Sequence, residues 1–184
     1  MNQNDTYFLE NSPLFSGKIR QVFNYSQDKL LIKTSDKISA FDFVFDDEVA
    51  KKGSLLTKIT KFWFNKTQHI IKNHLLDDSE LQDLIPKSHE SCMLVKKCRP
   101  IRIESIVRGY LSGSAYSEYL KNGKVSEISM IPGLKLNDRF DVPIFTPSTK
   151  AEVGDKDESI TFTQMKELIG NDEAIYINKK SIEL

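Results

Sequence analysis

Cysteine is scarce in this chain of 184 residues, which contains two, Cys92 and Cys98. We place both in one extended region, where a continuous strand separates them by about 20 Å, too far for a disulfide. We therefore expect two small thiols, buried or half-buried, in a reducing compartment, and we predict a cytoplasmic protein.

Long apolar runs are also missing. No segment approaches the roughly 20 apolar residues of a membrane span. The first residues, MNQNDTYFLE, lack the basic region and apolar run of a secretory signal. We therefore expect no membrane partner and no leader.

Charge of one sign is absent, because 26 Lys and Arg residues balance 26 Asp and Glu residues. Nucleic-acid-binding proteins usually carry a basic excess, so we expect no nucleic-acid partner. The three histidines, His69, His74 and His89, show no ligand spacing with each other or with the cysteines, and we expect no metal site built from them. The length and 39% hydrophobic content suffice for one full core or two small lobes.

The first half of the chain has a clear pattern of strands and one helix. Apolar residues three and four apart predict a helix over residues 55–76, with Ser54 or Thr57 capping its start and the aromatic cluster 62–64 in the core. Strands are expected at 17–23, 29–34, 43–49 and 91–97, the first two forming a hairpin.

The second half is less regular. A strand over 101–107 places Glu104, Ile106 and Arg108 on one face. A helix over 112–122 should end at Gly123. Residues 125–141 resemble a loop, and further helices are expected near 163–168 and over 173–184.

The stretch RGYLSGS, Arg108 to Ser114, is suited to holding a phosphate. Arginine offers a planar fork of donors, a helix start offers free N–H groups, and Gly113 allows close approach to the backbone after a turn at Gly109. The same pattern also fits an ordinary strand, turn and capped helix with Arg108 as a surface charge.

Five segments in order carry a resemblance to a known family. They are SGKIRQVF at 16–23, SDKISAFD at 35–42, KKGSLLTKITKFWF at 51–64, ESIVRGYLSGSAYSEY at 104–119 and FTPSTKAEVGDKDESI at 145–160. In these segments the chain resembles the SAICAR synthetase family, the phosphoribosylaminoimidazole-succinocarboxamide synthases of purine biosynthesis.

The resemblance implies an ATP-dependent ligase that joins L-aspartate to carboxyaminoimidazole ribonucleotide through an acyl phosphate, with ATP and Mg²⁺. It implies an α+β fold: two lobes of antiparallel sheet with flanking helices around an ATP cleft. We expect an N-terminal ATP-loop lobe over residues 1–98 and a substrate lobe over 99–184, with the second lobe incomplete, because family members continue beyond the point matching Leu184.

By resemblance, the ATP-binding residues are Gly17, Lys18, Arg20, Lys97 and Glu104. Three of these residues also have a simpler interpretation. Lys18 and Lys97 fit solvated surface lysines, and Glu104 fits an ion pair on a strand face.

The substrate-binding residues implied by the resemblance are Ser39, Asp42, Arg108, Ser112, Gly113 and Ser114. Arg108 and Ser114 match the pocket for the 5′-phosphate of the ribonucleotide. Ser39 and Asp42 also fit ordinary turn chemistry.

The resemblance places Lys150, Asp155 and Asp157 on the side of the reacting carboxylate and the aspartate. Lys156 stands where the family usually has histidine, and it fits a solvent-facing residue as well. No Mg²⁺ ligand is assigned. The alternatives to a complete ligase are a non-catalytic or altered-function nucleotide-binding module, or one half of a two-chain enzyme. A homo-oligomer or a complementing chain is compatible with the sequence.

Overall fold

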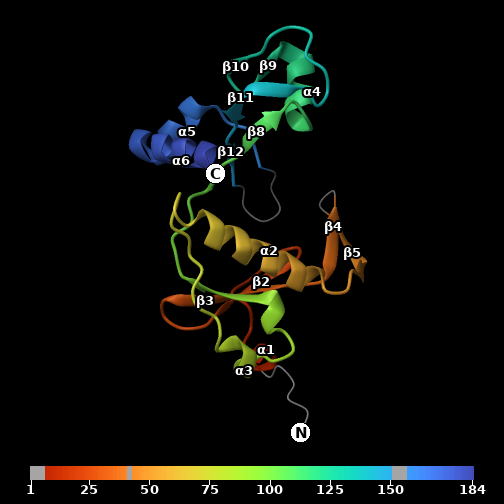
Figure 1. The fold of residues 1–184 in the computed structure, drawn as a ribbon, viewed down its shortest axis with the longest axis vertical. Coiled ribbons are helices and arrows are strands. Elements are labelled where there is room, and N and C mark those ends of the chain that lie inside the picture. The colour runs from red at the N-terminus through yellow and green to blue at the C-terminus, as the bar shows by residue number, and fades with distance from the viewer. Residues whose placement is uncertain (1–6, 41–42, 151–156) are drawn as a thin grey trace. The chain divides into compact units, whose positions relative to one another are not determined.

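The computed structural model describes residues 7–40, 43–150 and 157–184 (Figure 1). Within these ranges the chain forms two compact units, residues 1–99 and 100–184. Antiparallel sheets and helices make up both units, so the predicted α+β class is confirmed.

The first unit is built on an antiparallel sheet with the strand order β1-β2-β3-β6. Its strands are β1 (Phe15–Ser16), β2 (Arg20–Asn24), β3 (Lys29–Thr34) and β6 (Cys92–Lys96). A separate hairpin joins β4 (Lys37–Ala40) and β5 (Phe43–Glu48). The predicted 17–23/29–34 hairpin is confirmed in its essentials, because β2 pairs with β3 in continuous register.

Helices cover both faces of this sheet. Phe23, Leu31 and Leu94 pack with α3 (Leu81–Leu84) and with Tyr7 of α1 (Tyr7–Glu10). The longer helix α2 (Lys52–Thr67) contacts β3 and β6. Four successive β6 residues, 92–95, are therefore buried. A strand with only one covered face would instead show buried and exposed side chains in alternation. A short 3-10 helix (His89–Ser91) leads into β6.

The start of α2 differs from the prediction. Neither Ser54 nor Thr57 caps it; the carboxylate of Asp36 does, accepting a hydrogen bond from the Gly53 N–H at 2.8 Å. Gly53 lies so close to the preceding strand that a Cβ would stand 2.4 Å from the Thr34 carbonyl oxygen. Glycine is required here for close packing, and a residue distant in sequence supplies the cap.

The predicted end of this helix at residue 76 is wrong, because α2 ends at Thr67. The Asn73 side chain donates to the Phe64 carbonyl oxygen at 2.9 Å and accepts from the Leu75 N–H at 3.0 Å. Leu75 then bridges to Val95. The apolar residues at 75–76 therefore add to the edge of the sheet, and tertiary pairing outweighs the helical periodicity.

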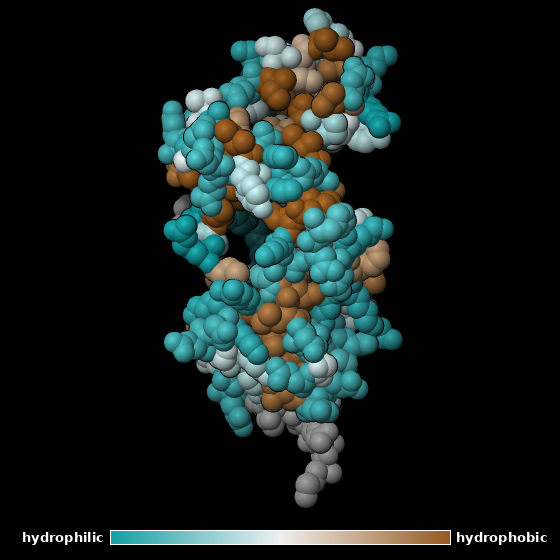
Figure 2. Space-filling model, turned by 60° about the vertical axis from the view of Figure 1, so that its left-hand side comes forward, coloured by the Kyte–Doolittle hydropathy of each residue, from teal (hydrophilic) through white to brown (hydrophobic). Residues whose placement is uncertain are grey.

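Two other predictions for this unit are wrong. Phe62 and Trp63 are 55% and 52% exposed, so they do not belong to the core. Cys98 is exposed, whereas Cys92 is fully buried, and both thiols are free. Apolar residues are visible on the surface of both units in Figure 2.

The second unit contains three antiparallel strand pairs, β8–β11, β7–β12 and β9–β10, among its described residues. The strands are β7 (Ile103–Glu104), β8 (Val107–Tyr110), β9 (Lys124–Val125), β10 (Ile128–Ser129), β11 (Arg139–Phe145) and β12 (Ser148–Thr149). The helices are α4 (Ser114–Asn122), α5 (Phe162–Ile169) and α6 (Asn171–Glu183).

Two small cores hold this unit together. Leu111, Ala115 and Val125 form one beneath α4. Met165 and Ala174 form the other where α5 and α6 meet β11. The two predicted C-terminal helices are confirmed, and α5 begins with a capping box between Thr161 and Gln164.

The predicted loop over 125–141 is wrong, because it contains a short hairpin and the start of β11. Two-residue strands are too short to show a period. Pro143 falls within β11, where the register shifts between Arg139 and Ile144 and a missing N–H is tolerated. The strand expected over 101–107 is divided into β7 and β8.

Candidate functional site

Arg108 is held by two hydroxyl groups from different elements of the second unit. Its Nε donates to Thr146 Oγ1 at 3.0 Å, and its Nη2 donates to Ser114 Oγ at 3.2 Å. Arg108 lies in β8, Ser114 is the first residue of α4, and Thr146 directly follows β11. Since neither partner is charged, the arginine keeps its full positive charge for a ligand.

The turn before α4 lies at Gly113, not at Gly109, which is inside β8. Gly113 is the N-cap residue of α4, with φ 58° and ψ −134°, a backbone conformation that favours glycine. Because glycine has no side chain, it cannot cap the first N–H groups of α4. The helix begins at Ser114 instead of Ser112, and it ends as predicted at Gly123, whose φ is 72°.

A pocket of about 280 Å³ opens beside this arginine. Its lining combines Arg108 with three carboxylates, and the predicted common face of Glu104, Ile106 and Arg108 is confirmed there. The lining residues are Glu104, Ile106, Arg108, Ser114, Ala115, Glu118, Val125, Ser126, Thr146, Pro147, Ser148, Asp157 and Ser159.

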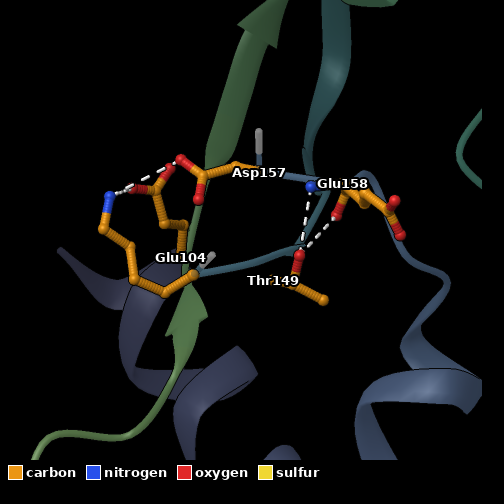
Figure 3. Close-up of polar contacts among 5 residues, drawn as sticks. Glu104, Thr149, Asp157 and Glu158 are labelled. Atoms are coloured by element: carbon orange, nitrogen blue, oxygen red, sulfur yellow. Dashed lines mark hydrogen bonds and ion pairs between the residues drawn. The ribbon is translucent and has the colours of Figure 1, made fainter. Parts of the chain in front are cut away.

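A second cationic group, Lys150, directly follows β12 at the β7–β12 strand pair. Lys150 Nζ forms an ion pair with Glu104 and lies 3.5 Å from Asp157 Oδ2. Figure 3 shows the two carboxylates pointing toward this nitrogen from different segments. The hydrogen bond that Lys150 donates to the Glu104 carboxylate, with a smaller effect from Asp157, raises the pKa of Lys150 above its usual value. The residue is therefore a cation at neutral pH and not a general base.

The backbone explains why these three residues meet. Ser148 pairs with Glu104 in the β7–β12 ladder, so Lys150 follows two residues later at the same edge. Thr149 and Glu158 fix the returning segment. Glu158 N donates to Thr149 Oγ1 at 3.0 Å (Figure 3). Thr149 N in turn donates to the Glu158 carbonyl at 2.9 Å. Asp157 is thereby placed opposite Glu104.

The predicted nucleotide loop lies in the first unit, in the turn between β1 and β2. Gly17 N donates to the Arg20 carbonyl at 2.8 Å, which closes the turn around Lys18. A Cβ at Gly17 would stand 3.2 Å from the Phe15 ring. Gly17, Lys18 and Arg20 are all exposed, so the loop presents both cations to solvent.

The remaining predicted residues are distributed more widely. Ser39 is half-buried in β4, opposite Val44. Lys97 has an exposed side chain, and its backbone N–H donates to the Asp28 carbonyl at 2.7 Å. Ser112 is half-buried just before Gly113. Asp42, Asp155 and Lys156 lie outside the described residues.

Sequence reasoning missed several residues of the pocket, among them Thr146, Glu118 and Ser126. Thr146 belongs to the FTPSTK segment, but only its buried contact with Arg108 reveals its role. Glu118 lies one helical turn after Ser114 on α4, so helical spacing could have indicated it. Ser126 has a positive φ of 55° in the β9–β10 turn, and no sequence signal marked it.

The described residues contain no group of three or more His, Cys, Asp or Glu side chains that could hold a metal ion. Glu104 and Asp157, the acidic residues nearest the reacting side, are both engaged with Lys150. Within residues 7–40, 43–150 and 157–184, the side chains therefore do not fit a Mg²⁺ site. In that same part of the chain, no helix is long and apolar enough to cross a membrane.

The fold and the pocket together define an α+β protein in which an arginine and a helix start, both suited to a phosphate, face a pocket that also contains carboxylates. Residues 13–184 match the family model for SAICAR synthetase. The chain belongs to the SAICAR synthetase family, and the predicted family membership is confirmed.

Curated relatives agree in sequence. The chain is 39% identical to the phosphoribosylaminoimidazole-succinocarboxamide synthase of Pasteurella multocida over 176 residues, which are 93% of this chain and 61% of that protein. It is 41% identical to the enzyme of the same name from Methylibium petroleiphilum, over 96% of this chain and 60% of that protein. The chain thus spans about three fifths of the length of these curated relatives.

Solved structures agree in fold. The SAICAR synthase of Saccharomyces cerevisiae in complex with SAICAR is similar with a TM-score of 0.85 and 33% identity, over 94% of this chain and 60% of that one. A type-2 SAICAR synthetase in complex with ADP has a TM-score of 0.70 and 22% identity, over 92% of this chain and 64% of that chain. The second likeness shows the shared fold alone.

Proposed function

We propose that this chain takes part in the ATP-dependent joining of L-aspartate to carboxyaminoimidazole ribonucleotide, a step of purine biosynthesis. The observation that carries this proposal is the Arg108 pocket. Arg108, Ser114 and Thr146 form a cationic site at the start of α4, beside the Lys150 cluster. Family membership supplies the reaction.

The phosphate of the ribonucleotide is assigned to Arg108 and Ser114. An arginine binds a phosphate through parallel N–H donors, and the N–H groups at the start of α4 add the positive end of the helix dipole. Gly113 has no atoms within 4 Å of its Cβ position, so the backbone there is accessible to a ligand. Ser112 stays a proposed substrate-binding residue on the family resemblance.

Lys150 and Asp157 are assigned to the reacting end of the substrate. A carboxylate is a poor electrophile, and transfer of the γ-phosphoryl group of ATP converts it into an acyl phosphate. The amine of L-aspartate then attacks the carbonyl carbon, an amide forms, and inorganic phosphate leaves. Lys150, held cationic by Glu104, stabilises negative charge on the transferring group, and Asp157 accepts a hydrogen bond from the incoming amine.

The nucleotide is assigned to the first unit, with Gly17, Lys18 and Arg20 over its phosphates and Lys97 beside its base. Glu104, which pairs with Lys150 in the second unit, stays a proposed nucleotide-binding residue on the family resemblance alone.

Magnesium accompanies ATP in most phosphoryl transfers, and we include it in the proposed reaction. No step is assigned to it here, because the described residues do not fit a site for it. Ser39, Asp42 and Asp155 stay proposed substrate-side residues on the family resemblance. A cytoplasmic location stays a prediction from the cysteine usage.

A second candidate is a ribonucleotide-binding module that needs another polypeptide for catalysis. It is favoured by one observation. The two side-chain hydrogen bonds of Arg108, to Thr146 and Ser114, lie within the second unit, whereas the nucleotide loop belongs to the first unit. Such a module would bind the ribonucleotide without turning over ATP.

One assay separates the two candidates. The purified chain is incubated with ATP, Mg²⁺, the carboxylated ribonucleotide and L-aspartate, and both ADP and the amide product are measured. The ligase predicts ADP release that depends on L-aspartate and on Lys150. ADP release without aspartate dependence contradicts the ligase, and ribonucleotide binding with no ADP release supports the binding module.

A further inference from the structure

Thr146 stands in the wall of the pocket, directly after β11, and it is 7% exposed. The carbonyl oxygen of Ile106 accepts two hydrogen bonds from it, one from the backbone N–H at 2.8 Å and one from the hydroxyl at 3.4 Å. Its Oγ1 also accepts a hydrogen bond from Arg108 Nε at 3.0 Å. The side chain therefore links Ile106, the residue just before β8, with Arg108.

These contacts fix the direction of the hydroxyl proton. A carbonyl oxygen can only accept, and the Arg108 Nε–H can only donate. The Thr146 proton must therefore point to Ile106, which turns a lone pair toward Arg108. The Thr146 hydroxyl thus donates one hydrogen bond to the Ile106 carbonyl and accepts one from the Arg108 Nε–H.

The consequence is a restrained guanidinium. Arginine has several rotatable bonds and a large rotamer entropy, so a single contact leaves its end mobile. With Nε held by Thr146 and Nη2 directed to Ser114, the plane of the group is fixed from two sides. The remaining N–H donors of the terminal nitrogens are then available to an oxyanion in the pocket.

We propose that Thr146 is a positioning residue, which acts through Arg108 by holding its guanidinium in the plane that receives an anionic phosphate group. This deepens the proposed function and rests on it for the identity of the ligand as a ribonucleotide. The hydrogen bonds from Arg108 to Thr146 and Ser114 do not depend on which ligand binds.

Two variants of the 184-residue chain separate the effect of the hydroxyl from the effect of the side-chain shape. Thr146→Val keeps the branched shape and the backbone hydrogen bond to Ile106 but removes the acceptor. Thr146→Ser keeps the acceptor. Thermal unfolding of both variants verifies that each is folded before binding is measured.

The test follows the Arg108 Nε–H signal by NMR in ¹⁵N-labelled protein, with the signal assigned from Arg108→Lys, while inorganic phosphate is added. The wild-type chain and Thr146→Ser should show a protected Nε–H and the same phosphate affinity. Thr146→Val should lose the protection and bind phosphate roughly five- to tenfold more weakly, the effect expected for one hydrogen bond. In the Arg108→Lys background, Thr146→Val should have no further effect.

Several results would overturn the proposal: no phosphate response of Arg108 in the wild-type chain, an unchanged affinity in Thr146→Val, an equal loss in Thr146→Ser, or the same loss in the Arg108→Lys background. A parallel titration uses carboxyaminoimidazole ribonucleotide. If this ligand fails to bind while phosphate binding depends on Thr146, the proposed substrate is wrong and the positioning role stands.

Discussion

Replacement of Arg108 by alanine should weaken ribonucleotide binding far more than ATP binding. The structure leaves the terminal guanidinium donors facing the pocket, enough for two charge-assisted hydrogen bonds to a phosphate. Each such bond contributes about 1.5–3 kcal/mol, so their loss should cost about 3 kcal/mol or more. Since 1.4 kcal/mol is tenfold in affinity, the dissociation constant should rise by roughly 100-fold or more.

The assay is calorimetric titration of the wild-type chain and the variant with each ligand separately. Arg108→Lys is the matched control, because it keeps the positive charge but loses the planar fork and the contact with Thr146. It should fall between the wild-type chain and the alanine variant. Equal losses for ATP and the ribonucleotide in Arg108→Ala would refute the reasoning, because they would indicate general damage and not a lost phosphate contact.

Three further predictions concern other parts of the chain. Lys18→Ala should weaken ATP binding and leave ribonucleotide binding unchanged in the same titration; an unchanged ATP affinity would exclude the loop. Gly53→Ala should lower the free energy of unfolding by about 2 kcal/mol or more, because its Cβ would stand 2.4 Å from the Thr34 carbonyl oxygen. Gly109→Ala, with open space at its Cβ, should change the free energy of unfolding by no more than about 0.5 kcal/mol in denaturant, so similar losses for the two variants would contradict the packing argument. Because acidic partners raise the pKa of Lys150, its ion pairs should stabilise the fold throughout the neutral range and up to the ordinary lysine pKa. That contribution should disappear only as the pH rises through the raised value, and a loss near neutral pH, seen by comparing wild-type and Lys150→Met unfolding, would contradict the assignment.

Local patterns predicted much of what surrounds the pocket. Strand alternation placed Glu104, Ile106 and Arg108 on one face, and all three line the pocket even though the strand is divided. Gly123 ended α4 because a left-handed backbone there favours glycine. Such features depend on neighbouring residues, so a single sequence carries them.

Features that depend on distant residues were not predictable in this way. The cap of α2 comes from Asp36, and the partner of Arg108 is Thr146, far along the chain. The end of α2 was set by the pairing of Leu75 with Val95, which only the folded sheet creates. Amphipathic periodicity indicates which side chains could be buried, but Phe62 and Trp63 show that it does not determine which ones are.

The central claim is that the Arg108 pocket receives the 5′-phosphate of a purine-pathway ribonucleotide. The most direct measurement compares the affinity of the wild-type chain for carboxyaminoimidazole ribonucleotide with its affinity for the corresponding nucleoside, which lacks the phosphate. We predict that the nucleoside binds at least roughly 100-fold more weakly, and that Arg108→Ala removes this difference. Equal affinities of the wild-type chain for the two ligands would contradict the account.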